Sequence, residues 1–274
     1  MGEKVTAGAV RIKAQLERFG LNPNRALGQN FLASAEKAEA IAEAACLGGL
    51  PVLEVGPGLG ALTGPLLCHA PRVCVVEIDK AMASALTALF PQEEKLLVLQ
   101  EDFLKADLDL IYGELGGPFA VAANLPYYVT TPICLRLLSC GLPIPRMVLM
   151  AQREAAGRFF ARPASKQYGP LSVLAQYYYA PQALMELSPG DYYPQPDVSS
   201  RVTLLTRRKT DLVPGLLDFL QRAFAMRRKT LANNLKGLPG GAEALEQCGI
   251  APGARAESLP PEALAMLAEN LLRK

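Results

Sequence analysis

Helical patterns and short, mainly apolar runs alternate along this chain from Ser34 to about residue 150, and this alternation limits the folds it can adopt. It predicts right-handed βαβ units in a parallel, doubly wound sheet. The expected helices cover residues 34–47, 60–68 and 80–90. The expected strands are Val52–Val55, Val73–Glu77, Leu96–Leu99, Phe119–Ala122, Met147–Met150 and Val202–Leu205.

The last of these strands is expected to pair antiparallel with a strand near Ala183–Leu187. Together the runs predict a doubly wound, mostly parallel, seven-stranded Rossmann-like α/β sheet. After Lys209 the pattern changes to helices only, with breaks at residues 239–241 and 252–253. We therefore expect two domains, residues 1–208 with a basic N-terminal arm and residues 209–274 as a small helical domain.

Composition excludes several classes of protein. With 274 residues and 50% hydrophobic content, the chain can bury a large core, so a fibrous or disordered protein is excluded. The six cysteines form no C-x-x-C pair and His69 is the single histidine, so we expect reduced thiols and no metal. We also expect a cytoplasmic chain without a membrane span, because no export signal is visible and glycines and prolines interrupt the uncharged stretch 115–135.

Charge is distributed unevenly along the chain. Residues 36–118 hold thirteen acidic and five basic residues, whereas residues 201–236 hold nine basic and two acidic residues. A basic segment of this kind suits a polyanion, although charge alone leaves a solvated helix face equally possible.

A glycine-rich turn, Leu53-Glu-Val-Gly-Pro-Gly-Leu-Gly60, lies between a predicted strand and a predicted helix. Backbone can approach a nucleotide-like ligand there without side-chain obstruction. Glu77 ends the second strand, where its carboxylate can accept both ribose hydroxyls, and Asp102 after the third strand could accept from an adenine amine. The turn alone does not separate NAD from S-adenosylmethionine, because Gly56, Gly58 and Ala61 also fit the dinucleotide fingerprint.

The tetrapeptide Asn124-Leu-Pro-Tyr127 follows the fourth strand and indicates the reaction. Adenine's exocyclic nitrogen is a poor nucleophile because its lone pair is delocalised into the ring. The side-chain carbonyl of Asn124 and the backbone carbonyl of Leu125 can accept from the amine and favour its attacking form. Pro126 restricts the backbone, and Tyr127 offers a flat face for an extruded base.

These motifs resemble those of the ribosomal RNA adenine N6-dimethyltransferases, specifically the bacterial type that dimethylates two adjacent adenosines near the 3′ end of 16S RNA. The resemblance covers nearly the whole chain. The segments that carry it are Leu27–Leu32, Glu54–Thr63, Val76–Asp79, Glu101–Phe103, Asn124–Tyr127, Gln152–Glu154, Ser165–Gly169, Leu171–Val173 and Ala223–Leu231.

The resemblance implies an enzyme that uses S-adenosylmethionine, releases S-adenosylhomocysteine and acts on 16S rRNA in small-subunit maturation. We also expect a monomer, although the sequence does not reveal the oligomeric state. The residues that it assigns to the cofactor are Asn30, Leu32, Gly56, Gly58, Gly60, Glu77, Ile78, Asp102, Phe103 and Asn124. Catalysis is assigned to Asn124, Leu125, Pro126 and Tyr127. The family's F-x-P-x-P-x-V-x-S stretch reads Tyr192 to Ser200 here, so we expect Tyr192 to cover the target base, with Tyr193 as the alternative.

RNA phosphates need cations, and the basic segments supply them. The candidates are Arg153, Arg222, Arg227, Arg228 and Lys229. Three other functions stay open: a 23S RNA adenine methyltransferase of the macrolide-resistance type, an NAD-dependent oxidoreductase, and a non-catalytic ribosome-assembly factor. The oxidoreductase leaves Asn124–Tyr127 and the basic C-terminal segment without a role.

Overall fold

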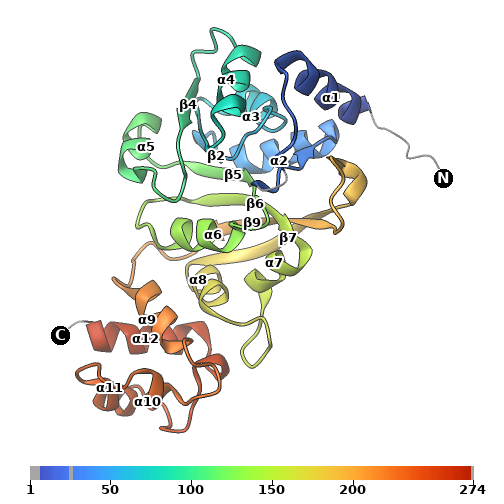
Figure 1. The fold of residues 1–274 in the computed structure, drawn as a ribbon. Coiled ribbons are helices and arrows are strands. Elements are labelled where there is room, and N and C mark those ends of the chain that lie inside the picture. The colour runs from blue at the N-terminus through green and yellow to red at the C-terminus, as the bar shows by residue number, and fades with distance from the viewer. Residues whose placement is uncertain (1–6, 25–26, 273–274) are drawn as a thin grey trace. The chain divides into compact units, whose positions relative to one another are not determined.

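The computed structural model describes residues 7–24 and 27–272, and its centre is a seven-stranded sheet (Figure 1). The strand order is β4-β3-β2-β5-β6-β9-β7. The strands are β2 (Val52–Val55), β3 (Val73–Glu77), β4 (Leu96–Gln100), β5 (Ala120–Asn124), β6 (Arg146–Gln152), β7 (Tyr179–Leu187) and β9 (Ser200–Arg207). Strands β4, β3, β2, β5 and β6 run parallel to one another, and β9 is antiparallel to β6. The expected fold class is confirmed.

The central strands β2 and β3 are buried along their whole length, which is typical of parallel strands covered on both faces, whereas the outer strands β4 and β7 are largely half-buried or exposed. The helices between the strands are α2 (Ala35–Cys46), α3 (Thr63–His69), α4 (Lys80–Leu89), α5 (Leu108–Leu115) and α6 (Thr130–Ser139). Three of them begin at a side chain that accepts a backbone N–H of the first turn: Ser34, Asp79 and Asp107. The Ser34 and Asp79 caps explain why α2 and α4 begin within one residue of the predicted starts, whereas α3, which has no side-chain cap, begins at Thr63 and not at residue 60.

A second, two-stranded sheet was not expected from the sequence. In it β1 (Phe31–Leu32) pairs antiparallel with β8 (Tyr192–Tyr193), with Phe31 opposite Tyr193. Helix α1 (Ala7–Phe19) packs its buried residues against Phe31. Two-residue strands have no periodicity to detect, and their pairing joins segments about 160 residues apart in the sequence, so only the folded chain reveals them.

The chain divides into two compact units, which we call unit 1 and unit 2. Unit 1 contains the described residues up to Ile133, Leu142–Ala156 and Gln182–Thr206, and unit 2 contains Cys134–Gly141, Gly157–Pro181 and the described residues from Arg207 onward. Unit 2 thus recruits chain from before residue 208. The expected linear boundary at residue 208 stays a proposal.

Unit 2 is built on α12 (Pro261–Leu272), which packs against α8 (Pro170–Tyr178), α9 (Leu216–Ala223) and α11 (Gly241–Gln247). The remaining short helices of the chain are α7 (Arg153–Gly157), α10 (Leu231–Asn234), and the 3-10 turns Arg158–Phe160, Pro189–Asp191 and Ala256–Ser258. None of the described helices combines the length and the apolar character that crossing a membrane requires. All six cysteines are free thiols.

Candidate functional site

A cavity of about 350 Å³ opens in unit 1 where the parallel strands β2 to β5 end, which is within the range of ligand pockets. The loops after all four strands contribute to it, and the segment around β1 contributes another wall. Nine of the ten residues expected at the cofactor line it: Asn30, Leu32, Gly56, Gly58, Glu77, Ile78, Asp102, Phe103 and Asn124.

The exception is Gly60, which does not line the cavity. A Cβ placed there would lie 2.6 Å from the ring of Phe90 and 2.8 Å from Leu86, so this glycine allows close packing instead. Its cofactor role stays a prediction without a contact to support it. Gly58 differs, since it has a φ of 54° and a Cβ there would meet the ring of Phe31 at 2.8 Å beside the cavity.

The buried carboxyl group of Glu77 is held rigidly by backbone hydrogen bonds. One carboxylate oxygen accepts the N–H of Gly58 at 3.0 Å, and the other accepts the N–H of Asp79 at 2.9 Å. Burial raises the pKa of Glu77, and these backbone hydrogen bonds oppose the rise. Each oxygen keeps a second lone pair, so the carboxylate can still accept hydroxyl groups from the cavity.

Glu54 also lines the cavity and is almost completely buried. Burial raises its pKa to about 8, a hydrogen bond from the Thr63 hydroxyl lowers it, and the neighbouring Glu77 raises it further. That hydroxyl donates to Glu54 Oε2 at 2.6 Å. Glu54 therefore holds a proton at neutral pH, and the cavity carries less negative charge than its acids suggest.

An apolar and a polar group meet at the β3 and β4 ends of the cavity. Ile78 is 46% exposed, which is unusual for a large aliphatic side chain and provides a flat apolar surface beside the ligand space. The Asp102 carboxylate accepts the backbone N–H of Leu104 at 2.9 Å, which fixes its position. Phe103 is buried and lines the cavity beside Asp102. This combination suits a purine ring with an exocyclic amine.

Asn124, Leu125 and Pro126 line the same cavity, at the end of β5. The side-chain amide of Asn124 donates from Nδ2 to the carbonyl oxygen of Asn30 at 2.9 Å, and the N–H of Leu125 donates to Met150 O at 3.0 Å. The hydroxyl of Thr130 donates to Pro126 O at 3.0 Å. These bonds fix the loop and leave the Asn124 carbonyl oxygen as the group that can accept from a ligand.

The two tyrosines expected at the target base, Tyr127 and Tyr192, differ from each other in burial. Tyr127 is half-buried, its hydroxyl lies 3.2 Å from Ser200 Oγ, and burial raises its pKa. Tyr192 is only 2% exposed and packs in the core beneath the sheet, so no face of its ring is open to a base. The base-covering role of Tyr192 therefore stays a prediction that this conformation does not support, with half-buried Tyr193 as the alternative.

The cavity wall also contains two residues that sequence reasoning missed. Tyr128 is 54% exposed and lines the cavity, although Tyr127 does not. Gln29 lines it as well, between two residues of the recognised N-terminal motif. A second tyrosine directly after the Asn124–Tyr127 motif was a usable signal for Tyr128. Gln29 lies within the recognised Leu27–Leu32 segment, but its bond to Asp79 joins residues 50 positions apart, so the sequence did not reveal this contact.

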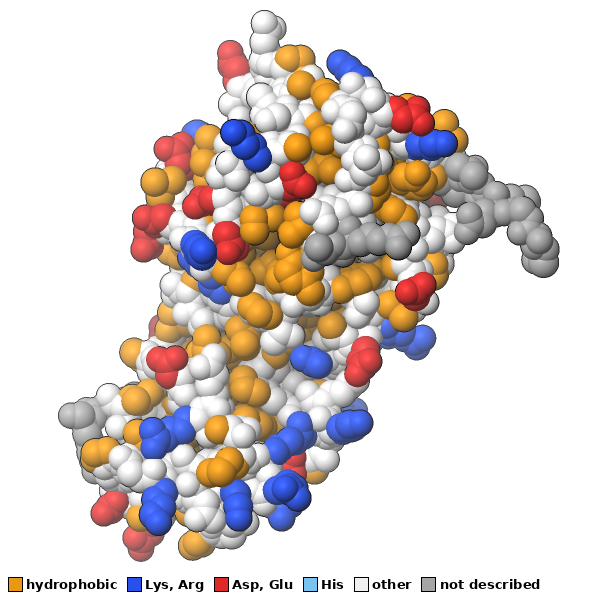
Figure 2. Space-filling view, viewed as in Figure 1, with side chains coloured by type: hydrophobic (Ala, Val, Ile, Leu, Met, Phe, Trp, Pro, Cys, Tyr) orange, Lys and Arg blue, Asp and Glu red, His pale blue; other side chains and the backbone are white. Residues whose placement is uncertain are grey.

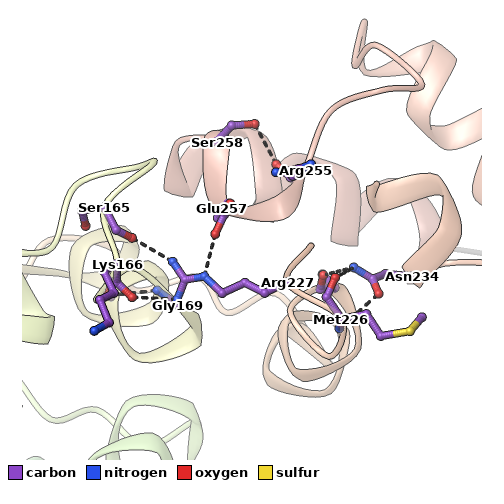
Figure 3. Close-up of polar contacts among 11 residues, drawn as sticks. Ser165, Lys166, Gly169, Met226, Arg227, Asn234, Arg255, Glu257 and Ser258 are labelled. Carbon is purple, nitrogen blue, oxygen red and sulfur yellow. Dashed lines mark hydrogen bonds and ion pairs between the residues drawn. The ribbon is translucent and has the colours of Figure 1, made fainter. Parts of the chain in front are cut away.

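Two of the proposed phosphate-binding arginines are occupied within unit 2. Figure 3 shows the guanidinium of Arg227 between three groups: its Nε donates to Glu257 at 2.5 Å, and its Nη atoms donate to the carbonyls of Ser165 at 2.8 Å and Lys166 at 2.7 Å. Arg222 donates to the carbonyls of Asn234 and Lys236. These arginines connect segments of unit 2.

The exposed side chains of Arg228 and Lys229 make no hydrogen bond or ion pair within residues 7–24 and 27–272. Figure 2 shows Lys and Arg side chains gathered on the visible face of the helical unit 2. The exposed Arg153 belongs to unit 1, where its backbone N–H donates to Ser199 O. The contacts thus divide the predicted RNA-binding residues into occupied and available cations.

One group outside the cavity has metal-ligand types. The ligand atoms of Glu39, Glu43 and His69 lie within 4.8 Å of one another, and His69 Nε2 is 2.5 Å from Glu39 Oε1. Exposed acids of this kind are common without an ion. The expectation of no metal stays a prediction.

Comparison with known proteins decides the family. A sequence model of the family described as ribosomal RNA adenine dimethylase matches residues 20–272. The chain belongs to this family. Among its relatives in the family is a ribosomal RNA small subunit methyltransferase A from Geobacillus thermodenitrificans, 38% identical over 96% of this chain and 95% of the relative. Another, of the same name from Latilactobacillus sakei, is 40% identical over 97% of this chain and 95% of the relative. The resemblance drawn from the motifs is confirmed.

Solved structures agree with this membership. A dimethyladenosine transferase from Plasmodium falciparum has a TM-score of 0.69 at 22% identity, over 85% of this chain and 94% of that one, which supports the fold. The 23S rRNA methyltransferase ErmE has a TM-score of 0.60 at 28% identity, over 88% of this chain and 99% of that one. The fold of the family is thus shared by enzymes named for different RNAs.

Proposed function

We propose that this chain is an S-adenosylmethionine-dependent rRNA (adenine-N6)-dimethyltransferase that acts on two adjacent adenosines in the 3′-terminal stem-loop of 16S rRNA. One observation carries the proposal: Asn124 lies in the same cavity as the glycine turn and Glu77, with its amide nitrogen already bonded to Asn30. The acceptor oxygen and the nucleotide-binding features therefore share one space.

The cavity fits S-adenosylmethionine by the chemistry of its walls. Glu77 offers carboxylate lone pairs for ribose hydroxyls, Asp102 an acceptor for the adenine amine, and exposed Ile78 an apolar surface for the purine. When bound, this cofactor supplies an activated methyl group on a sulfonium. The chain therefore has to bind, orient and exclude water, and it needs no nucleophile of its own.

The residues of the β5 loop act on the target amine. The Asn124 carbonyl oxygen and the Leu125 carbonyl accept its two hydrogens, which favours the pyramidal nitrogen with its lone pair directed at the methyl group. Tyr127 stacks on the extruded base, an interaction worth roughly 1 to 3 kcal/mol. The proton leaves the methylated nitrogen to water, so a general base is not required.

RNA is held through phosphate contacts of the available cations. Arg228 and Lys229 are exposed and without a side-chain partner among the described residues, which favours them as contacts. Arg153 is exposed in unit 1 and can serve similarly. The residues 209–274 accordingly form an RNA-contacting region, and the link to small-subunit maturation follows from the substrate.

A second candidate is an enzyme for 23S RNA, favoured by the similarity to ErmE at 28% identity. The relatives named for the small subunit are 36% to 40% identical over nearly the full chain, which favours 16S RNA. An NAD-dependent oxidoreductase and a purely non-catalytic assembly factor are disfavoured, since neither uses the Asn124 loop.

The proposal is tested by incubating the protein with labelled S-adenosylmethionine and separated ribosomal subunits, and then mapping the modified nucleotides. We expect dimethylated adenosines in the 3′-terminal stem-loop of small-subunit RNA. Label on large-subunit RNA alone would support the second candidate, and absence of label on both would overturn the enzymatic assignment.

A further inference from the structure

Gln29 is held at both ends of its side-chain amide. Its Oε1 accepts the backbone N–H of Asn24 at 2.8 Å, and its Nε2 donates to Asp79 Oδ2 at 3.2 Å. The backbone N–H of Gln29 also donates to Asn24 O at 3.3 Å. This glutamine therefore ties the segment before β1 to the end of β3.

Asp79 connects this tie to the ribose-binding side of the cavity. Its Oδ1 caps α4 by accepting the N–H groups of Ala81 and Met82, which leaves Oδ2 for Gln29. Its own N–H donates to Glu77 Oε1 at 2.9 Å. A continuous set of hydrogen bonds thus runs from Glu77 through Asp79 to Gln29.

The residue after Gln29 reaches the catalytic amide. Asn30 O accepts Asn124 Nδ2 at 2.9 Å, and the Asn30 side chain donates back to Gly28 O at 3.1 Å. An amide rotated by half a turn would present N–H groups to an incoming amine, donor against donor. The position of the Asn30 carbonyl therefore decides whether Asn124 offers oxygen or nitrogen to the substrate.

We propose that Gln29 is a positioning residue for methyl transfer: by bonding Asp79 it holds the Asn30 carbonyl where it turns the Asn124 amide toward the target base. This inference rests on the proposed function. It makes the glutamine of the Gly28–Leu32 segment part of the reaction geometry while Phe31 and Leu32 stay held by their own pairing with β8.

The test exchanges the side chains of the two hydrogen-bonding partners, Gln29 and Asp79, so that the bond is first broken and then restored. Gln29→Glu places two carboxylates together and breaks the bond, and Gln29→Ala removes it without adding charge. In the double variant Gln29→Glu with Asp79→Asn, the new amide donates to the new carboxylate, so the bond and the net charge are restored. For each variant kcat, the RNA KM and the Kd for S-adenosylhomocysteine are measured, with thermal unfolding as a check of folding.

We expect kcat to fall about tenfold in both single Gln29 variants, as for loss of one orienting hydrogen bond, and to return to within about threefold in the double variant. The KM for RNA and the Kd for S-adenosylhomocysteine should change less than about threefold, since β1 stays paired. Gln92→Glu adds the same charge at an exposed loop position of unit 1 away from the cavity, and it should behave as wild type.

Unchanged kcat in folded Gln29→Ala, or no recovery in the double variant, would overturn this role while wild-type methylation still stood. If wild type itself transfers no methyl group to ribosomal RNA, the proposed function fails first. A loss confined to cofactor affinity would also contradict the inference, because it would make Gln29 a binding residue.

Discussion

Unit 1 and unit 2 use their polar side chains in opposite ways. In unit 1 the polar groups around the cavity are bonded to one another, so that Glu77, Asp79 and Asn124 each have a fixed direction. In unit 2 the cations lie at the surface, where some connect segments and others stay available. From this difference we expect the geometry of unit 1 to govern the chemistry and the charge of the available cations to govern the affinity for RNA.

The strongest test of this contrast is Asn124→Ala. We expect methyl transfer to fall by at least about 10²-fold, because one of two acceptors aimed at the amine is lost. Binding of RNA should change little, since Asn124 adds no charge. Single-turnover methylation and a filter-binding titration measure the two quantities. Wild-type turnover would refute the assigned role, and an equal loss of RNA binding would erase the distinction between the units.

A second test compares Arg228 with Arg227, which is bonded to other residues of unit 2. Arg228→Gln should weaken RNA binding and reduce the slope of log affinity against log salt by about 0.7 to 0.9, as for one lost phosphate contact. Lys229→Gln should do the same. The quantity is read from RNA titrations at several salt concentrations, and an unchanged slope would remove both residues from the interface.

In the Glu257→Gln variant, the direction of the change in RNA affinity shows whether Arg227 contacts phosphate. If Arg227 were a phosphate contact, removing its carboxylate partner would release the cation and strengthen RNA binding. We expect weaker binding, because Arg227 then loses its 2.5 Å ion pair with Glu257 and the 165–166 segment is less firmly held. Tighter binding in the same titrations would return Arg227 to the phosphate contacts.

The smallest effect concerns Glu54. Its folded pKa of about 8 lies above the ordinary value of 4.5, so the folded state holds a proton that the unfolded chain has released. The contribution of this proton to the free energy of unfolding is complete below about pH 4.5 and is lost as pH rises to about 8. We expect Glu54→Gln to flatten this fall in the melting temperature between pH 5 and 8. An equally steep fall in the variant would assign the dependence to other groups.

Most of the fold could be predicted from local patterns in the sequence. The β2 and β3 bounds match the predicted Val52–Val55 and Val73–Glu77 because a buried parallel strand must be an apolar run of limited length. The glycine turn and the Asn124 loop were found for a similar reason, since each follows directly after such a strand. Parallel strands bring these loops to one edge, which the alternation alone implies.

Only the tertiary structure decided which polar groups face each other. Tyr192 matches a motif position, yet its ring lies in the core, and Arg227 stands beside Arg228 in sequence, yet only Arg227 is bonded to Glu257. The contact from Asn30 to Asn124 joins residues 94 positions apart. Side-chain direction and long-range partners depend on how the whole chain packs, whereas strand and turn chemistry is written in consecutive residues.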